Sequence, residues 1–418
     1  MINEDFVIFL LFSLSVQLEV PFSIRQLSQN ETFPLIYIGL YIGSPLTEYK
    51  LLYDTSSQYT VLISSESTLS HPNRAYDSYA SNTMEVVDKQ NKLFIRDDIY
   101  GMGLYTKDKV TNTLSSQGTN ITFVFATEYY HPLINYNCDG IAGLNYQYSQ
   151  LTFSLIDTLY ISRSINKKIF AHRYLNETYG KVYLGEDGIN SELNLSEMKE
   201  CNVQDDNWSC HLRNVSFNNE TIDMNKTIMF STGSYLIEFP YKTIEGILVH
   251  YNELLNQLNN NCSIIHLNNY KDFIECDEIK KIERLPTLHF NFDKNVVIPI
   301  DYRDMFIHSK EKNNYQFVIQ GNKLVNSDGK IGLIALKNYH TIFNKDKYSI
   351  SFIPIRTFIE IFESPDVLSS FIFGFLITLA ITLSLCVVCS FMRKRRKSRY
   401  EFDKIPSEKL QEFTSIII

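Results

Sequence analysis

Two stretches far apart in the chain share one pattern, and this pattern constrains the fold most. The first is Leu51 to Leu62, with the sequence LLYDTSSQYTVL, and the second is Thr227 to Ile237, with the sequence TIMFSTGSYLI. In each, an apolar run meets a loop of small hydroxylic residues and is followed by a second apolar run, which predicts strand, tight loop and strand. The repeat indicates a duplicated fold with two lobes that meet at these loops.

The first loop carries a carboxylate, Asp54, at its tip. An Asp in such a loop is either a functional group or an Asx-turn residue that hydrogen-bonds its own backbone. Because the loop pattern recurs at the second stretch, we favour the functional interpretation for Asp54.

Further motifs follow in a fixed order: Tyr37 to Pro45, the tetrapeptide Tyr100-Gly101-Met102-Gly103, Cys138 to Leu144, Gly180 to Asp187, Leu285 to Phe290, and Ile331 to Asn344. Together with the two loops, they resemble the pepsin-like aspartic peptidases between about Phe33 and Ile355. The resemblance implies an all-β, two-lobed pepsin-like acid protease fold, with duplicated β-barrel lobes around a central cleft. It implies no cofactor, and the histidines show no metal-ligand spacing.

The resemblance also assigns the catalytic positions. The family uses two aspartates that share a water and one proton, so that one acts as base and the other as acid. Asp54 stands at the first position and Ser231 at the second. Serine cannot supply a carboxylate, and losing an acid or base partner costs a factor on the order of 10² to 10⁴ in rate. Ser56 also stands where the family has glycine. The resemblance therefore predicts impaired catalysis.

The surroundings of the pair match the family better. The resemblance implies that the hydroxyls of Thr55 and Thr232 brace the two loops, with Gly233 and the second hydroxyls, Ser57 and Ser234, preserved. It assigns Tyr100, Gly101 and Gly103 to a flap over the cleft. We expect the hairpin arms of this flap at residues 82–92 and 93–110.

The two ends of the chain predict a secreted and anchored protein. The apolar run Phe6 to Val16 predicts a signal peptide over residues 1–18, although the acidic Glu4 and Asp5 leave a buried N-terminal strand as the alternative. Uncharged residues 367–391 predict a transmembrane helix, and the basic cluster behind it places residues 392–418 in the cytosol. The orientation is that of a single-pass type I protein, with its ectodomain outside the cell or in a secretory or endolysosomal lumen.

Between these ends we expect an N-terminal lobe at residues 33–168, a C-terminal lobe at 169–357 and a stalk at 358–366. Helices are expected at Leu151 to Ile165 and Thr243 to Leu258. We expect no long basic prosegment of the kind that covers the catalytic pair in zymogens of the family.

Sequons and cysteines fit an oxidising compartment. The sequence N-x-[ST] begins, always ahead of the predicted span, at Asn30, Asn120, Asn176, Asn194, Asn207, Asn214, Asn219, Asn225 and Asn261. Cys201 with Cys210, and Cys262 with Cys276, are predicted disulfides, and the second of these resembles a disulfide of the family. Cys138 remains as a buried free thiol.

Three functions are compatible with these features. The first is a membrane-anchored, catalytically impaired peptidase domain that binds an extended peptide or protein partner in its cleft. The others are an active aspartic endopeptidase and a surface adhesion or structural protein. The net charge of −8 argues against nucleic acid as a partner.

Overall fold

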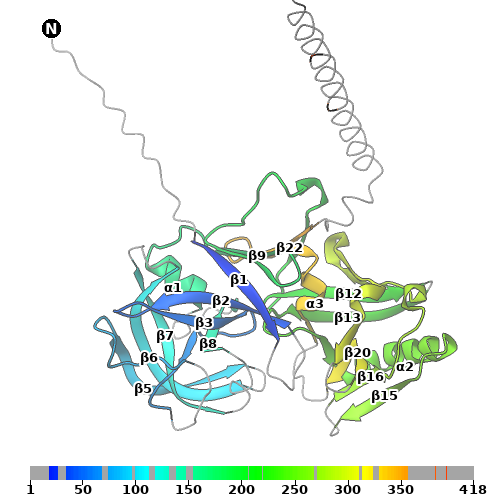
Figure 1. The fold of residues 1–418 in the computed structure, drawn as a ribbon, viewed down its shortest axis with the longest axis horizontal. Helices are drawn as coiled ribbons and strands as arrows, with labels where there is room; N and C mark the ends of the chain where they lie inside the picture. The colour runs from blue at the N-terminus through cyan, green and yellow to red at the C-terminus, as the bar shows by residue number, and fades with distance from the viewer. Residues whose placement is uncertain are drawn as a thin grey trace, which may run out of the picture. The chain divides into compact units, whose positions relative to one another are not determined.

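The computed structural model describes residues 18–26, 34–67, 74–96, 99–112, 118–130, 138–146, 154–205, 207–218, 220–267, 271–309, 313–322, 329–355, 382 and 392 (Figure 1). The chain divides into two units, Met1–Ile355 and Arg356–Ile418, and the elements named below belong to the first. Within the described residues, no helix has the length and apolar character needed to cross a membrane. The predicted span at 367–391 lies outside them, apart from Thr382.

The first sheet contains thirteen strands. Eight come from the N-terminal part of the chain: β1 (Leu18–Gln26), β2 (Pro34–Ile42), β3 (Thr47–Asp54), β4 (Val61–Ile63), β5 (Glu85–Arg96), β6 (Ile99–Thr111), β7 (Thr119–Tyr130) and β8 (Gly140–Gly143). Strands β2, β3, β8, β4, β7 and β6 pair in that order, and β6 pairs again with β2 through Tyr41 opposite Thr111. This ring is a closed six-stranded barrel.

The same sheet continues into strands from later in the chain. These are β9 (Ile169–Tyr174), β10 (Tyr179–Leu184), β11 (Lys199–Asn202), β22 (Tyr339–Asn344) and β23 (Ser349–Pro354). Strand β1 lies between β10 and β2 and pairs with both, so it joins these strands to the barrel (Figure 1). We call the run β11-β23-β22-β9-β10-β1 the seam.

The second sheet contains ten strands and stays open in the described residues. Its strands are β12 (Ser209–Phe217), β13 (Glu220–Phe230), β14 (Ile237–Pro240), β15 (Cys262–Leu267), β16 (Lys271–Cys276), β17 (Leu288–Phe292), β18 (Val297–Ile300), β19 (Phe306–Ser309), β20 (Asn314–Asn322) and β21 (Lys330–Ile331). Short 3-10 turns lie at Leu195–Glu197, Ile282–Arg284, Asp293–Asn295 and Tyr302–Asp304.

Three helices accompany the sheets: α1 (Leu155–Ile161), α2 (Tyr241–Gln257) and α3 (Leu333–Leu336). Helix α2 is amphipathic, because its apolar residues recur every three or four positions and form one buried face. Those residues are Ile244, Ile247, Leu248, Tyr251 and Leu255. This face covers β20, β15 and β16 (Figure 1).

One arrangement of four strands occurs in both sheets. In the first sheet, β3 pairs parallel with β8, β8 antiparallel with β4, and β4 parallel with β7. In the second, β13 pairs parallel with β21, β21 antiparallel with β14, and β14 parallel with β20. The chain visits both sets in the same order, which is the structural form of the repeat in the sequence. The two candidate loops follow β3 and β13.

The fold class predicted from the sequence is confirmed in its coarse form, a mostly β architecture, with two corrections. Helix α2 lies close to the helix expected at Thr243 to Leu258. Only the first sheet closes into a barrel among the described residues. Strand β1 precedes the point near Phe33 where we expected the fold to begin. The lobe boundary at residues 168 and 169 stays a prediction.

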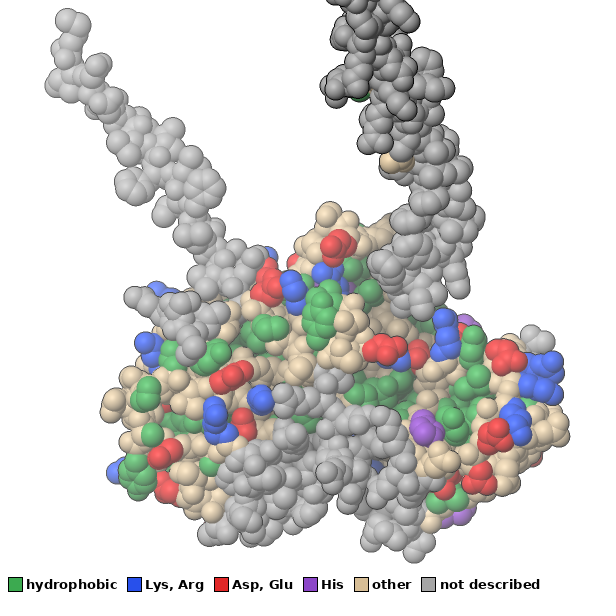
Figure 2. Space-filling view, in the orientation of Figure 1, with side chains coloured by type: hydrophobic (Ala, Val, Ile, Leu, Met, Phe, Trp, Pro, Cys, Tyr) green, Lys and Arg blue, Asp and Glu red, His purple; other side chains and the backbone are tan. Residues whose placement is uncertain are grey.

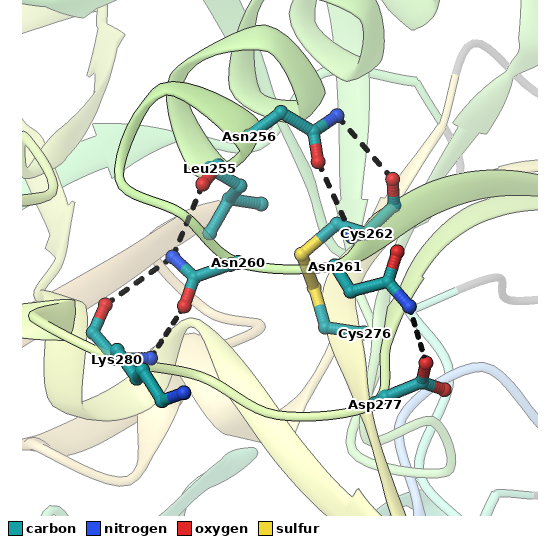
Figure 3. Close-up of a disulfide and its surroundings, with 8 residues drawn as sticks. All are labelled: Leu255, Asn256, Asn260, Asn261, Cys262, Cys276, Asp277 and Lys280. Atoms are coloured by element: carbon teal, nitrogen blue, oxygen red, sulfur yellow. Dashed lines mark hydrogen bonds between the residues drawn. A yellow bond between two sulfur atoms is a disulfide. The ribbon is translucent and has the colours of Figure 1, made fainter.

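The disulfides are confirmed, and each has a distinct structural role. Cys201–Cys210 joins β11 of the first sheet to β12 of the second, and Cys262–Cys276 joins the neighbouring strands β15 and β16. In Figure 3, the second bridge lies beside Asn256. The Asn256 side chain donates to the Cys262 carbonyl and accepts from the Cys262 N–H, each at 3.3 Å. Cys138 is buried and takes part in neither of these two disulfides.

Charged side chains of both signs are mixed over the face shown in Figure 2. Of the nine sequon asparagines, Asn30 and Asn219 lie outside the described residues. Asn214 is half-buried, and the other six are exposed: Asn120, Asn176, Asn194, Asn207, Asn225 and Asn261. Most described sequons are therefore accessible to a modifying enzyme, and their glycosylation stays a prediction.

Candidate active site

The structure brings the two predicted loops together. Thr55 N–H donates to Thr232 Oγ1 at 3.0 Å, and Thr232 N–H donates to Thr55 Oγ1 at 3.0 Å. The hydroxyls themselves donate across the loops, from Thr55 to the Phe230 carbonyl at 2.8 Å and from Thr232 to the Tyr53 carbonyl at 2.9 Å. All four bonds are buried. The result is a reciprocal brace that fixes one loop against the other.

Asp54 lies at the start of the first loop, and none of its side chain is exposed. Its Oδ1 accepts two hydrogen bonds from Ser56, one from the backbone N–H at 2.9 Å and one from the hydroxyl at 2.7 Å. The first is an Asx-turn, so the structure shows the local interaction, and the functional interpretation of this carboxylate stays a prediction. The second depends on the serine side chain, and glycine could not make it.

Ser231 occupies the equivalent place at the start of the second loop. It is also fully buried, and its Oγ has no hydrogen-bond partner among the described residues. Its backbone N–H donates to the Ile331 carbonyl at 2.9 Å. The loop is therefore formed as the repeat requires, but its first side chain is a neutral hydroxyl that cannot take a negative charge near neutral pH.

The remaining hydroxyls of the loops are also equivalent. Ser57 Oγ donates to the Tyr59 carbonyl at 3.0 Å, and Ser234 Oγ donates to the Leu236 carbonyl at 3.4 Å. Each bond spans two residues and stabilises the turn locally. Gly233 continues the second loop and is buried.

Each loop is supported from below by a glycine. A Cβ on Gly143 would lie 2.2 Å from the Tyr59 carbonyl oxygen, and a Cβ on Gly332 would lie 2.4 Å from the Leu236 carbonyl oxygen. Only glycine permits such close contact between backbones. The segments that carry these glycines therefore pack closely against the loop backbone in both halves.

Two residues that sequence reasoning missed attach the first loop to its surroundings. Asn145 Nδ2 donates to the Ser56 carbonyl at 3.0 Å. The indole N–H of Trp208 donates to the Leu144 carbonyl at 2.6 Å, and Leu144 N–H donates to the Asp54 carbonyl at 2.9 Å. Trp208 is the one tryptophan in the chain, and this rarity was the signal in the sequence that could have indicated it.

The predicted flap is a hairpin of β5 and β6, with Arg96 opposite Ile99, so its arms are displaced from the expected 82–92 and 93–110. Gly101 and Gly103 lie within β6, between β5 and β7, and both are buried. A Cβ on Gly103 would lie 2.3 Å from the Phe125 carbonyl oxygen, which explains this glycine. The backbone of Tyr100 pairs with β5 and β7, and its side chain lies outside the described part.

Two buried histidines lie on neighbouring strands of the seam, His172 on β9 and His340 on β22. Neither ring nitrogen of His172 has a hydrogen-bond partner among the described residues. The Nε2–H of His340 donates to the Asp187 carbonyl at 2.6 Å. Burial, with the nearby His340, lowers the pKa of His172 from 6.5 to about 3, and burial lowers the pKa of His340 to about 4. Both rings are therefore neutral in the folded protein.

The fold and the braced loops define a class: two copies of one strand–loop–strand unit whose loops face each other and are joined through paired threonines. A sequence model of the family described as eukaryotic aspartyl protease matches residues 36–355. The chain belongs to the eukaryotic aspartyl protease family. A search of the curated proteins finds no match.

Proposed function

We propose that this protein is a membrane-anchored member of the family that has lost competent catalysis and binds an extended peptide or protein partner in the cleft between its lobes. The observation that carries the proposal is the residue at the second catalytic position, Ser231. Hydrolysis by this family requires two carboxylates that share a proton. A serine hydroxyl hydrogen-bonds a ligand but takes no part in that exchange.

The environment of the first carboxylate supports the proposal. Asp54 Oδ1 already accepts two bonds from Ser56, and neither Asp54 nor Ser231 has any exposed surface. A general base must reach the proton that it removes. Ser56 and Ser234 are among the half-buried residues of the loops, so a ligand would contact these edges before it reached the carboxylate.

We propose that the protein functions near neutral pH, and the two buried histidines of the seam support this. Aspartic catalysis depends on a carboxylate that stays protonated, which acid conditions promote. Acid would also force protons onto His172 and His340, whose burial disfavours the charged form. The brace of Thr55 and Thr232 keeps the loops in place without any catalytic demand on them.

Strand β5 provides an edge at which an extended ligand could bind. This strand ends the order of the first sheet and pairs only with β6 among the described strands. An edge strand presents unpaired backbone N–H and C=O groups to which another strand can add. We propose recognition through the backbone of the ligand, with side-chain contacts setting specificity.

Rescue of the catalytic pair tests the proposal. We expect no acid proteolysis from the wild type or from Ser231→Asp, and measurable pepstatin-sensitive proteolysis at about pH 4 from Ser231→Asp with Ser56→Gly. The second change removes the hydroxyl bond to Asp54 Oδ1 and keeps the backbone one. A restored acid–base partner is worth on the order of 10² to 10⁴ in rate. Ser231→Asn with Ser56→Gly is the matched control, because it has a similar shape and no acid.

Three outcomes of the rescue are informative. Pepstatin-sensitive cleavage by the wild type would overturn the proposal and favour an active endopeptidase. A folded but inactive double variant would show that the cleft itself has changed. Equal activity in the Ser231→Asn control would assign the activity to a contaminant.

The anchored topology is a separate part of the proposal, supported by the apolar run at 367–391 and by sequons that all precede it. We propose cleavage of the signal peptide near residues 15–18, which would remove at most Leu18 from β1. Digestion of intact cells with peptide N-glycosidase should reduce the apparent mass, and a C-terminal epitope should resist external protease. Loss of that epitope without permeabilisation would refute the orientation.

A further inference from the structure

A cavity of about 350 Å³ lies where several elements end. It is lined by Tyr146, which follows β8, by Lys168, which precedes β9, and by three residues of the turn between β22 and β23, Lys345, Asp346 and Tyr348. Its volume is in the range of small-molecule sites. None of these residues belongs to the two braced loops.

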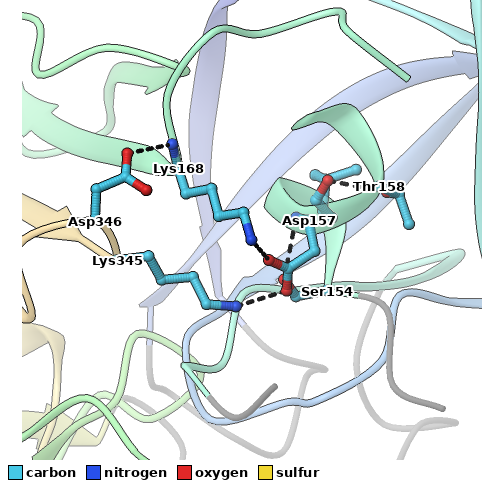
Figure 4. Close-up of polar contacts among 7 residues, drawn as sticks. Ser154, Asp157, Thr158, Lys168, Lys345 and Asp346 are labelled. Atoms are coloured by element: carbon cyan, nitrogen blue, oxygen red, sulfur yellow. Dashed lines mark hydrogen bonds and ion pairs between the residues drawn. The ribbon is translucent and has the colours of Figure 1, made fainter. Parts of the chain in front are cut away.

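Two ammonium groups at this cavity share one buried carboxylate (Figure 4). Lys345 Nζ donates to Asp157 Oδ2 at 2.6 Å, and Lys168 Nζ lies 3.5 Å from Asp157 Oδ1. Ser154 Oγ donates to the same carboxylate at 2.6 Å. The side chain of Lys345 is only 6% exposed. With both lysines protonated, this triad of two lysines and one aspartate has a formal net charge of one positive, and the Lys168 side chain is 27% exposed.

The other acidic group at the cavity does not fully offset this charge. Asp346 is exposed to solvent, and its Oδ2 already accepts the backbone N–H of Lys168 at 3.0 Å. Burial lowers the pKa of Lys345, and Lys168 adds to this effect, while Asp157 and Asp346 oppose it. A buried ammonium that remains under-compensated is stabilised by an added anion.

Aromatic rings form the rest of the wall. The rings of Tyr146 and Tyr348 lie 5.6 Å apart, centroid to centroid, at an angle of 57°. Tyr348 is 62% exposed, although a large aromatic side chain is stabilised by burial. Lys345 Nζ lies 5.8 Å from the centre of the Tyr146 ring. The cavity therefore presents positive charge beside a flat apolar surface.

We propose that this cavity binds a small organic oxyanion, a carboxylate, phosphate or sulfate attached to an aromatic or sugar ring. The oxyanion accepts hydrogen bonds from Lys168 and Lys345, and the ring packs on Tyr146 and Tyr348. Hydrogen bonds between ammonium and oxyanion are charge-assisted and short. The site goes beyond the proposed function, since it needs neither the cleft nor Asp54.

The single tryptophan provides the assay. The rings of Trp208 and Tyr146 lie 5.0 Å apart, so a ligand on Tyr146 should change the tryptophan emission. We would titrate the purified full-length protein with phenyl phosphate, inorganic phosphate, phenol and glucose 6-phosphate, and confirm binding by calorimetry. Saturable binding is expected for phenyl phosphate and weaker binding for inorganic phosphate. If glucose 6-phosphate binds as well as phenyl phosphate does, the two tyrosines accept a sugar ring. If glucose 6-phosphate does not bind, they accept only an aromatic ring.

Three variants locate the site. Lys168→Gln should weaken phenyl phosphate binding about tenfold or more, because it removes a charged donor. Tyr348→Ala should weaken phenyl phosphate binding about three- to tenfold. Because the Tyr348 ring is exposed, this variant should still fold. Lys347→Gln is the matched control, since this exposed lysine is in the same turn but does not line the cavity, and it should leave binding unchanged.

Several results would overturn the proposal. Absence of saturable phenyl phosphate binding would do so directly. Equal weakening by Lys347→Gln would reveal attraction to surface charge alone, and unchanged binding in both Lys168→Gln and Tyr348→Ala would place the ligand elsewhere. Equal affinity for inorganic phosphate and phenyl phosphate would remove the ring from the proposal.

Discussion

The two buried histidines of the seam predict that the protein loses stability in acid. His172 and His340 are neutral when folded, with pKa values of about 3 and about 4, and both return to about 6.5 when the chain unfolds. Between these values the unfolded chain binds more protons than the folded one. The free energy of unfolding therefore falls as the pH drops below about 6.5, until it approaches the folded-state pKa values.

The size of the effect follows from the shifts. From about pH 7.5 to about pH 5, each histidine removes about 2 kcal/mol from the free energy of unfolding, and the two together remove about 4 kcal/mol. Domains are commonly stable by about 5 to 15 kcal/mol, so this loss is a large fraction of the total. Carboxylates also titrate in this range, and a comparison of variants is needed to separate their contribution.

The informative perturbation is His172→Phe. The ring of His172 lies 5.7 Å from the ring of Tyr53, and 6.1 Å from both Tyr174 and Phe343, so phenylalanine suits the site. Urea denaturation followed by Trp208 fluorescence should show that the variant loses about 2 kcal/mol less than the wild type over the same pH interval.

A control variant, His308→Phe, makes the same chemical change at an exposed position. It should retain the pH dependence of the wild type. If His172→Phe and the wild type lose stability in parallel, the reasoning from burial is refuted, because protonation of His172 would then cost nothing in the folded state.

Two further predictions concern the braced loops. Thr232→Val should lower the free energy of unfolding by about 2 to 4 kcal/mol in urea denaturation, because it leaves the Thr55 N–H and the Tyr53 carbonyl without their buried partner. Thr232→Ser keeps the hydroxyl and should cost much less, and equal losses in the two variants would exclude a role for the hydroxyl. Gly332→Ala should lower the melting temperature, because its Cβ would lie 2.4 Å from a backbone oxygen. Gly246→Ala, in α2, has no atom within 4 Å of the added Cβ and should stabilise the protein by about 0.5 to 1 kcal/mol. The same effect at both glycines would contradict the close packing at the second loop.

Much of the site was predictable because the loops are local motifs. The residues of the brace and the disulfides follow from short patterns in a known order. The bond from Ser56 to Asp54 could be expected in outline, since the two residues are neighbours in one turn. The complete burial of the carboxylate could be seen only in the packed structure.

What the sequence did not predict depends on distant parts of the chain. Strand β1 forms because β10 and β2 each offer it an edge, and Pro21 within it weakens any local strand signal. Lys345 lies in a polar turn, where a lysine side chain is usually exposed, yet its ammonium is buried and donates to Asp157 of α1. The burial of His172 arises from aromatic rings on two other strands, β3 and β22, and from one on its own strand. Such environments are properties of the tertiary fold.

The position of β1 in the seam also affects how the chain folds as it is synthesised. Strand β1 emerges from the ribosome early, but it can pair with β10 only after the chain has passed Tyr179. Strand β9 can pair with β22 only after the chain has passed Tyr339. Pairings of such long range form slowly. The N-terminal barrel can close first, while β9 keeps an open edge until nearly all of the family domain is made. A chain interrupted before β22 would expose that edge to the same edge of another copy, which is a route to aggregation.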